Sequence, residues 1–217
     1  MITSSFGVVG RTHSRDEDDD VPEHKRRPRL QWAWWIVALL LTFALYQLSG
    51  AGWIYAKATL AQHLIARSWE KSKSLGQAPR PWPWADTRAV ARLTVPSRGV
   101  ELYVLDGTSG RSLAFGPGHV NGTAAPGSEG NSVIVAHRDT HFAFLRDLAG
   151  DEEITVETAR GKVTHYRVRE VTIVDKGETR VLDAADSAQL TLITCYPFDA
   201  VQPGTTQRYV VIADRVA

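Results

Sequence analysis

Cys195 is the single cysteine among the 217 residues, and it ends an apolar stretch that begins at Gln189. A lone cysteine cannot form an intramolecular disulfide, whereas exported proteins usually pair their cysteines. An unpaired thiol therefore indicates either a buried side chain that packs as a small hydrophobe or a reactive nucleophile. Both faces of the predicted strand are mixed in polarity, so its alternation leaves these two roles open.

Two further side chains could assist such a thiol. His137 follows the apolar stretch 132–136, and an imidazole beside a thiol can take up its proton and later protonate a leaving amine. Arg208 begins the stretch 208–212, where a guanidinium could stabilise the negative charge that develops during acyl transfer. These residues can meet only if the ends of distant strands lie side by side. A surface histidine and a salt-bridged edge arginine are the ordinary alternatives.

The pair His137 and His141 also raises the question of a metal site. Histidines four residues apart can bind zinc from one face of a helix. The glutamate that follows the first histidine in such metalloproteases is replaced here by Arg138, and a helix beginning near Phe142 would not hold both histidines. We therefore expect no metal and no cofactor, with a zinc hydrolase as an alternative.

The positions that separate these residues read mainly as strands. Glycine- and proline-rich turns divide short alternating or continuously apolar stretches, which favours an all-β barrel or sandwich. The predicted strands are 91–95, 100–105, 132–136, 153–157, 163–174, 189–195 and 208–212. Short helical segments are expected at 111–115 and 142–148. The net charge of +1 argues against a nucleic-acid partner, which would require a basic surface.

The N-terminal part has a different character. Residues 1–29 are charged and poor in apolar periodicity, so we expect a disordered tail. Residues 30–56 contain an almost wholly apolar run from Trp32 to Tyr46 that continues more weakly to Tyr55, with aromatic residues at both ends. This pattern predicts a single transmembrane anchor helix. Residues 57–80 are predicted to form a helical stalk and linker, and 81–217 the globular domain.

Basic residues precede the predicted anchor. Lys25, Arg26, Arg27 and Arg29 place the N-terminus in the cytoplasm by the positive-inside rule. The expected location is then the inner (cytoplasmic) membrane, with the globular domain on the periplasmic or extracytoplasmic side. A cleaved signal peptide, with Ser49-Gly50-Ala51 as the processing site, is the alternative.

Several segments together resemble the sortase family. Thr191-Leu-Ile-Thr-Cys195 matches the family signature Thr-Leu-x-Thr-Cys, Val135-Ala-His137-Arg138 is similar to its histidine segment, and Arg208 matches its arginine. Ala136 stands where the family usually has glycine. Stretches 81–87, 113–119 and 137–142 are similar to the Gram-negative class, class GN.

This resemblance implies a closed eight-stranded β-barrel with one or two short helices and a hydrophobic groove. It implies a membrane-anchored cysteine transpeptidase that cleaves a sorting motif near the C-terminus of a substrate protein through a Cys195 thioester. The acyl group would then pass to an amine acceptor in the cell envelope. His137 is expected to act as acid and base and Arg208 to stabilise the oxyanion, without a metal or cofactor.

Four more residues are expected to support the site. Thr194 and Tyr196, which flank the cysteine, are predicted to help position the substrate, while Asp139 or His141 is predicted to orient His137. Two other functions remain open. A cysteine transpeptidase acting on peptidoglycan would usually carry a Ser-x-Gly-Cys turn, which residues 193–195 lack. A non-enzymatic, membrane-tethered β domain would have a buried, inert cysteine.

Overall fold

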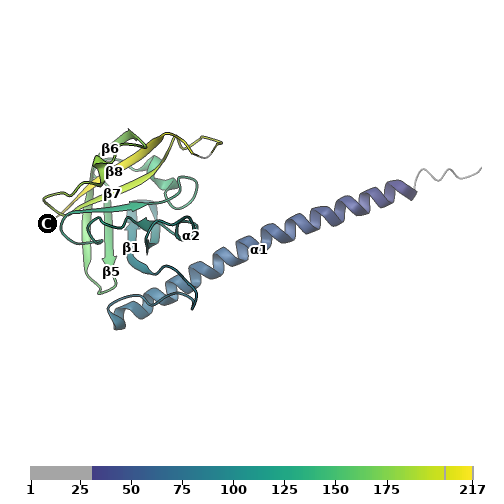
Figure 1. Cartoon of the computed structure of the whole chain (residues 1–217), viewed down its shortest axis with the longest axis horizontal. Coiled ribbons are helices and arrows are strands. Elements are labelled where there is room, and N and C mark those ends of the chain that lie inside the picture. The colour runs from purple at the N-terminus through teal and green to yellow at the C-terminus, as the bar shows by residue number, and fades with distance from the viewer. Residues whose placement is uncertain (1–30, 203, 217) are drawn as a thin grey trace, which may run out of the picture. The chain divides into compact units, whose positions relative to one another are not determined.

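A closed barrel of eight strands forms the body of the protein (Figure 1). The computed structural model describes residues 31–202 and 204–216, with side chains for all of them except 31, 45 and 47–58. Neighbouring strands follow the order β1-β2-β3-β4-β7-β8-β6-β5. The strands are β1 Ala89–Val95, β2 Val100–Asp106, β3 Gly118–His119, β4 Asn131–Val135, β5 Glu153–Thr158, β6 Val163–Asp175, β7 Gln189–Tyr196 and β8 Gln207–Arg215. The predicted mostly β, closed barrel is confirmed.

The strand β3 is the one that the hydropathy pattern did not predict. It contains two residues, pairs with β2 on one side and β4 on the other, and has no alternation to detect. A Cβ added at Gly118 would lie 2.3 Å from the carbonyl oxygen of Gly107. Glycine is therefore required where these two backbones approach closely.

Helical segments are few. They are α1 Gln31–Leu75, α2 Gly110–Leu113 and the 3₁₀ turns Pro96–Arg98, Ala143–Asp147 and Arg180–Leu182. The short helices predicted from sequence coincide with α2 and with the second 3₁₀ turn. Ser109 caps α2 by accepting a hydrogen bond from the Ser112 amide at 3.1 Å.

The helix α1 is continuous across the predicted anchor and most of the predicted stalk. It ends at Leu75, and Gly76 follows with a φ of +73°, a left-handed conformation that suits glycine at a helix end. Within the part of the chain that the structure describes, no helix is both long enough and apolar enough to cross a membrane. The side chains of residues 45 and 47–56, like the whole predicted tail 1–29, lie outside the described residues.

The chain divides into two compact units, residues 1–50 and 51–217. The second unit contains the barrel and the C-terminal turns of α1. Ile65 and Trp69 of these turns are buried against Ala89 and Leu105, and the Trp69 ring lies 6.0 Å from the Tyr103 ring. Burial of these apolar side chains holds this end of the helix against β1 and β2.

The interior of the barrel is apolar, as the alternating strands require. Leu93, Ile134, Leu192 and Val211 are fully buried members of one core cluster. A second cluster of Val133, Ile193 and Val210 lies on the opposite face of β4, β7 and β8. These three strands are therefore covered on both faces, which explains why their sequences are continuously apolar rather than alternating.

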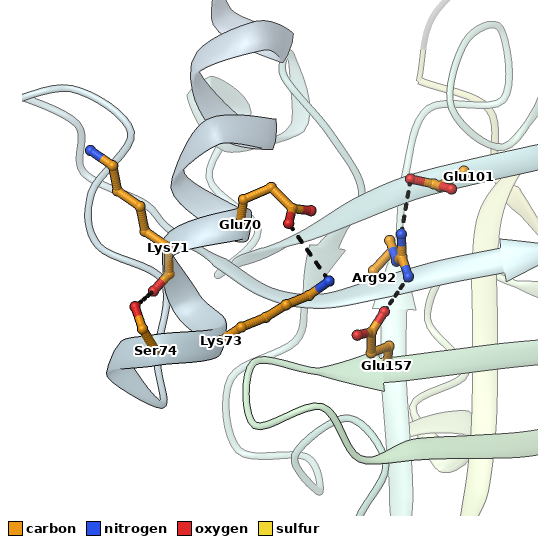
Figure 2. Close-up of polar contacts among 7 residues, drawn as sticks. All are labelled: Glu70, Lys71, Lys73, Ser74, Arg92, Glu101 and Glu157. Atoms are coloured by element: carbon orange, nitrogen blue, oxygen red, sulfur yellow. Dashed lines mark hydrogen bonds and ion pairs between the residues drawn. The ribbon is translucent and has the colours of Figure 1, made fainter.

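Ion pairs join neighbouring strands on the side of the barrel near the end of α1. Arg92 of β1 lies between Glu101 of β2 and Glu157 of β5 (Figure 2). This arrangement matches the position of β1 between those two strands. The same figure shows the exposed pair Glu70 and Lys73, whose charged atoms are 3.6 Å apart on α1.

Candidate active site

The strand register brings the three predicted catalytic residues level with one another. On antiparallel β7 and β8, Cys195 pairs directly with Arg208. On parallel β4 and β7, Val135 pairs with Ile193, and the Ala136 amide donates to the Ile193 carbonyl at 3.3 Å. His137 lies two residues beyond Val135, just as Cys195 lies two beyond Ile193. Three segments far apart in sequence thus end side by side.

The same register predicts which face of the sheet these side chains occupy. Side chains alternate along a strand, and directly paired residues share a face. Leu192 points into the barrel core, so Ile193 and Cys195 belong to the outer face. Arg208 is two residues from Val210 of the outer cluster, and His137 has the same parity as Val133. Cys195 and Arg208 therefore lie on one face, and the alternation of β4, continued two residues past its end, assigns His137 to the same face.

Exposure is consistent with chemistry at this place. Cys195 is a free thiol and is half-buried, Arg208 is half-buried and His137 is exposed. The cysteine is not sealed in the barrel core, which is where an inert packing residue would lie. A reagent from solvent can therefore reach this outer face.

The Arg208 guanidinium uses only some of its hydrogen-bond donors within the protein. Its Nη1 atom donates to the carbonyl oxygens of Thr205 and Gln207, each at 2.8 Å. Its Nε and Nη2 atoms form no hydrogen bond with other residues that the structure describes. Because a guanidinium carries five N–H groups, several donors remain for a developing oxyanion.

The Thr194 side chain contacts the segment that carries His137 and is not exposed to solvent. Its hydroxyl donates to the Ala136 carbonyl at 2.8 Å, and the residue is 2% exposed. This bond lies inside the protein, and the role of Thr194 in positioning the substrate stays a prediction. That bond connects β7 to the residue directly before His137.

Tyr196 belongs to a small aromatic cluster at the start of the β7–β8 loop. Its ring stacks on Tyr209 with centroids 6.1 Å apart, and Phe198 packs edge-on against Tyr209 at 5.1 Å. All three side chains are half-buried. This cluster gives the nucleophile strand a rigid end, which supports the prediction of a positioning role without testing it.

The two residues predicted to orient His137 have other partners. Asp139 is 3.3 Å from the Nε atom of Arg138. Burial lowers the pKa of His141, the charge of nearby His137 lowers it further, and the Ala114 carbonyl partly offsets both effects. The two imidazoles are thus within electrostatic range. Among the described residues, neither Asp139 nor His141 forms a hydrogen bond with His137.

Sequence reasoning missed one residue of this region. Arg138 is buried and donates hydrogen bonds to carbonyl oxygens of the β7–β8 loop, at Pro197, Ala200 and Gln202. Its neighbours in the sequence give no sign of this role, because all three acceptors are backbone atoms about sixty positions away. The one signal in the sequence for a role of Arg138 was its place directly after His137, the candidate base.

Two surface hollows of similar size differ in their relation to this site. One of about 490 Å³ is lined by the β7–β8 loop from Tyr196 to Gln207 and begins at the residue after Cys195. The other, of about 510 Å³, is lined by β1 and the loops around Ala125 and Arg160 and contains none of the candidate residues.

In the described chain no three His, Cys, Asp or Glu residues group to hold a metal, and His137 and His141 lie on a turn rather than a helix.

A family model named "Sortase domain" matches residues 93–216, more than half of the chain. The chain belongs to the sortase family. It is 31% identical over 125 residues to Sortase D of Bacillus subtilis strain 168, an alignment that includes 57% of this chain and 62% of that protein. The chain therefore spans less than two thirds of this relative.

Solved sortase structures share the fold. A sortase D5 transpeptidase of Clostridium perfringens superposes with a TM-score of 0.60 at 23% identity, over 73% of this chain and 99% of that one. Sortase C-1 of Actinomyces oris gives 0.54 at 28% identity, over 70% and 98%. The domain match and these relatives support the predicted enzyme class, a cysteine transpeptidase.

Proposed function

We propose that this chain is a sortase-type transpeptidase that cleaves a sorting motif near the C-terminus of a substrate protein and transfers the acyl group to an amine. The observation that supports this most directly is the register of β4, β7 and β8, which pairs Cys195 with Arg208 and ends β4 two residues before His137. These are the nucleophile, the proton carrier and the cation that such a reaction needs.

In the first half-reaction the Cys195 thiolate attacks the carbonyl carbon of the scissile peptide bond. The unoccupied donors of Arg208 stabilise the oxyanion of the tetrahedral intermediate, with a backbone N–H near Tyr196 as a second donor. As the intermediate collapses, the C–N bond breaks and protonated His137 gives its proton to the departing amine. The acyl group remains on Cys195 as a thioester.

In the second half-reaction an amine acceptor attacks the thioester carbonyl. Neutral His137 takes up the proton that the amine loses, a new amide bond forms and the Cys195 thiolate leaves. The thiolate and the imidazolium are then restored. Neither half-reaction uses a metal or a redox cofactor.

The outer face also suggests what kind of peptide binds. Ile193 and Val210, each two residues from Cys195 or Arg208, are buried on this outer face. The partly buried apolar residues packed against them include Val120, Val135, Val174 and Ile212. An apolar strip of this kind suits an extended peptide with apolar side chains, as the expected hydrophobic groove requires. We further propose class GN, supported by the similarity of stretches 81–87, 113–119 and 137–142 to that class.

The proposed enzyme is attached to the inner membrane by residues 30–56, with its N-terminus in the cytoplasm and its barrel on the extracytoplasmic side. In support, Trp34, Trp35 and Leu39 of α1 are more than two thirds exposed, and the neighbouring residues are also apolar. A helix that is apolar all around its circumference is stable in lipid rather than in water. Attachment would concentrate the enzyme beside membrane-bound substrates.

The anchor can be tested by charged substitutions in the full chain. Leu40→Arg combined with Phe43→Arg is expected to move the protein from the carbonate-washed membrane pellet to the soluble fraction, since each charge costs about 3 kcal/mol at the centre of a span. Leu75→Arg is the matched control: Leu75 is equally exposed, at 63% against 60% for Leu40, but lies at the far end of α1. Recovery of the unsubstituted chain in the soluble fraction would refute the anchor.

The transfer reaction is tested by trapping the thioester. The full chain is incubated with a randomised library of synthetic peptides, and its intact mass is measured before and after treatment with hydroxylamine, which cleaves thioesters. We expect acyl adducts that map to Cys195 and disappear with hydroxylamine. Cys195→Ala serves as the control and should acquire none.

Two results would contradict this proposal. If the unsubstituted chain forms no adduct, or if Cys195→Ala forms the same adducts, Cys195 is not an acyl carrier. Adducts with muropeptides but not with linear peptides would instead favour the peptidoglycan-acting transpeptidase.

A further inference from the structure

Arg138 is the one charged residue that is buried among those the structure describes, with 6% of its surface exposed. A charge in such a place is strongly destabilising unless hydrogen bonds or an opposite charge compensate it. Its carboxylate neighbour, Asp139, has a side chain that is 69% exposed and offers weak compensation. The main partners of the guanidinium must therefore be other groups.

These partners are backbone carbonyls of the β7–β8 loop. The Nη1 atom donates to Pro197 at 2.8 Å, and Nη2 donates to Ala200 at 2.6 Å and to Gln202 at 3.3 Å. One planar guanidinium thus holds three points of a single loop, a geometry that the compact head of a lysine cannot reproduce. The first of these points lies two residues after Cys195.

The position of Arg138 in the chain gives these bonds a further consequence. The His137 imidazole is exposed and forms no hydrogen bond within the described chain, while the backbone carbonyl of His137 accepts from the Phe142 amide at 3.0 Å. The neighbours of His137 therefore determine where the imidazole lies. On one side, Ala136 accepts the bond from Thr194, the residue before Cys195. On the other side, Arg138 holds the loop that follows Cys195. The segments carrying the imidazole and the thiol are therefore joined both before and after the reacting residues.

We propose that Arg138 is a positioning residue that keeps His137 and Cys195 within reach of each other. This role rests on the proposed transpeptidase function. A displacement of about 1 Å in a reacting pair can lower a rate by about 100-fold. Loss of the three loop bonds is accordingly expected to act on kcat more than on KM, and on the environment of the thiol even without substrate.

The test compares Arg138→Met and Arg138→Lys in the full chain with Arg92→Met. Arg92 is the control because it is a half-buried arginine held by two acceptors, the carboxylates of Glu101 and Glu157 (Figure 2). It lies on β1, which pairs with β2 and β5 and not with β4 or β7. Three quantities are measured: kcat and KM with a peptide that forms the thioester, the rate of Cys195 alkylation by iodoacetamide against pH, and the thermal midpoint.

The measurements are made at a temperature where circular dichroism shows that the variant is folded. For Arg138→Met we expect kcat to fall by about 10- to 100-fold. We also expect the rate of Cys195 alkylation to depend differently on pH. Arg138→Lys should be intermediate in both. Arg92→Met should lower the thermal midpoint while leaving kcat and the alkylation profile unchanged.

A folded Arg138→Met variant with normal kcat and a normal alkylation profile would overturn the proposal and leave Arg138 a purely structural residue. If Arg138→Met does not fold, Arg138→Lys decides, and normal values in that variant would overturn it equally. The alkylation profile needs no substrate. Failure of the unsubstituted chain to form a thioester would therefore refute the proposed function while the positioning of Cys195 by Arg138 remained measurable.

Discussion

Replacing His137 by alanine is expected to lower kcat for peptide cleavage by about 100- to 10,000-fold, the usual contribution of a general acid–base residue. The leaving amine would have to depart without a proton donor, and the attacking amine would have no base. Since the His137 side chain is exposed and forms no hydrogen bond within the described residues, its removal should leave the fold intact. Single-turnover formation of the thioester, followed by mass spectrometry, measures the loss at the first step.

His165→Ala is the control for this experiment. His165 is also an exposed histidine, but it lies on β6 and its partner is Glu153 of the neighbouring strand. Its substitution should leave kcat within about two-fold of the unsubstituted value, as for ordinary surface changes. Equal effects of the two substitutions, or a loss below about three-fold for His137→Ala, would show that another group carries the proton.

Replacing Arg208 by methionine is expected to lower kcat by about 100- to 1,000-fold, the range measured when one donor to an oxyanion is removed. The methionine keeps much of the aliphatic volume but removes every guanidinium N–H group of the residue that pairs with Cys195 in the register. Arg208→Lys should recover part of the rate, because an ammonium supplies charge but not the planar fork. Steady-state kcat and KM with the peptide identified by thioester trapping provide the measurement.

The substitution at Arg208 also removes the bonds to Thr205 and Gln207, so a control on the same strand is needed. Arg215→Met serves this purpose: Arg215 lies at the other end of β8 and pairs with exposed Glu129. It should leave kcat unchanged. If Arg208→Met raises KM while kcat stays normal, Arg208 binds substrate in its ground state and does not stabilise the oxyanion.

Most of the strands were accessible from the pattern of residues, whereas the closed barrel was implied only by the resemblance to the sortase family. Strands such as β5 and the first half of β6 alternate between buried and exposed positions, and this period identifies a strand whatever lies around it. β3 was not predicted, because two residues cannot show a period and its place depends on close contact between backbones at Gly118. The single helix from Gln31 to Leu75 was predicted as two segments, because the weakly apolar residues around Gly50 interrupt the pattern without ending the helix.

The order of the residues is enough to predict that a lone cysteine ends one strand, that a histidine follows another and that an arginine begins a third. That these strands are neighbours follows from the folded chain, through the parallel register of β4 and β7 and the antiparallel register of β7 and β8. The fold also determines that the Cys195 thiol lies on the outer face and that Arg138 is buried among the carbonyls of a distant loop. Such contacts form between backbone groups that every residue type carries, so local residue patterns cannot encode them.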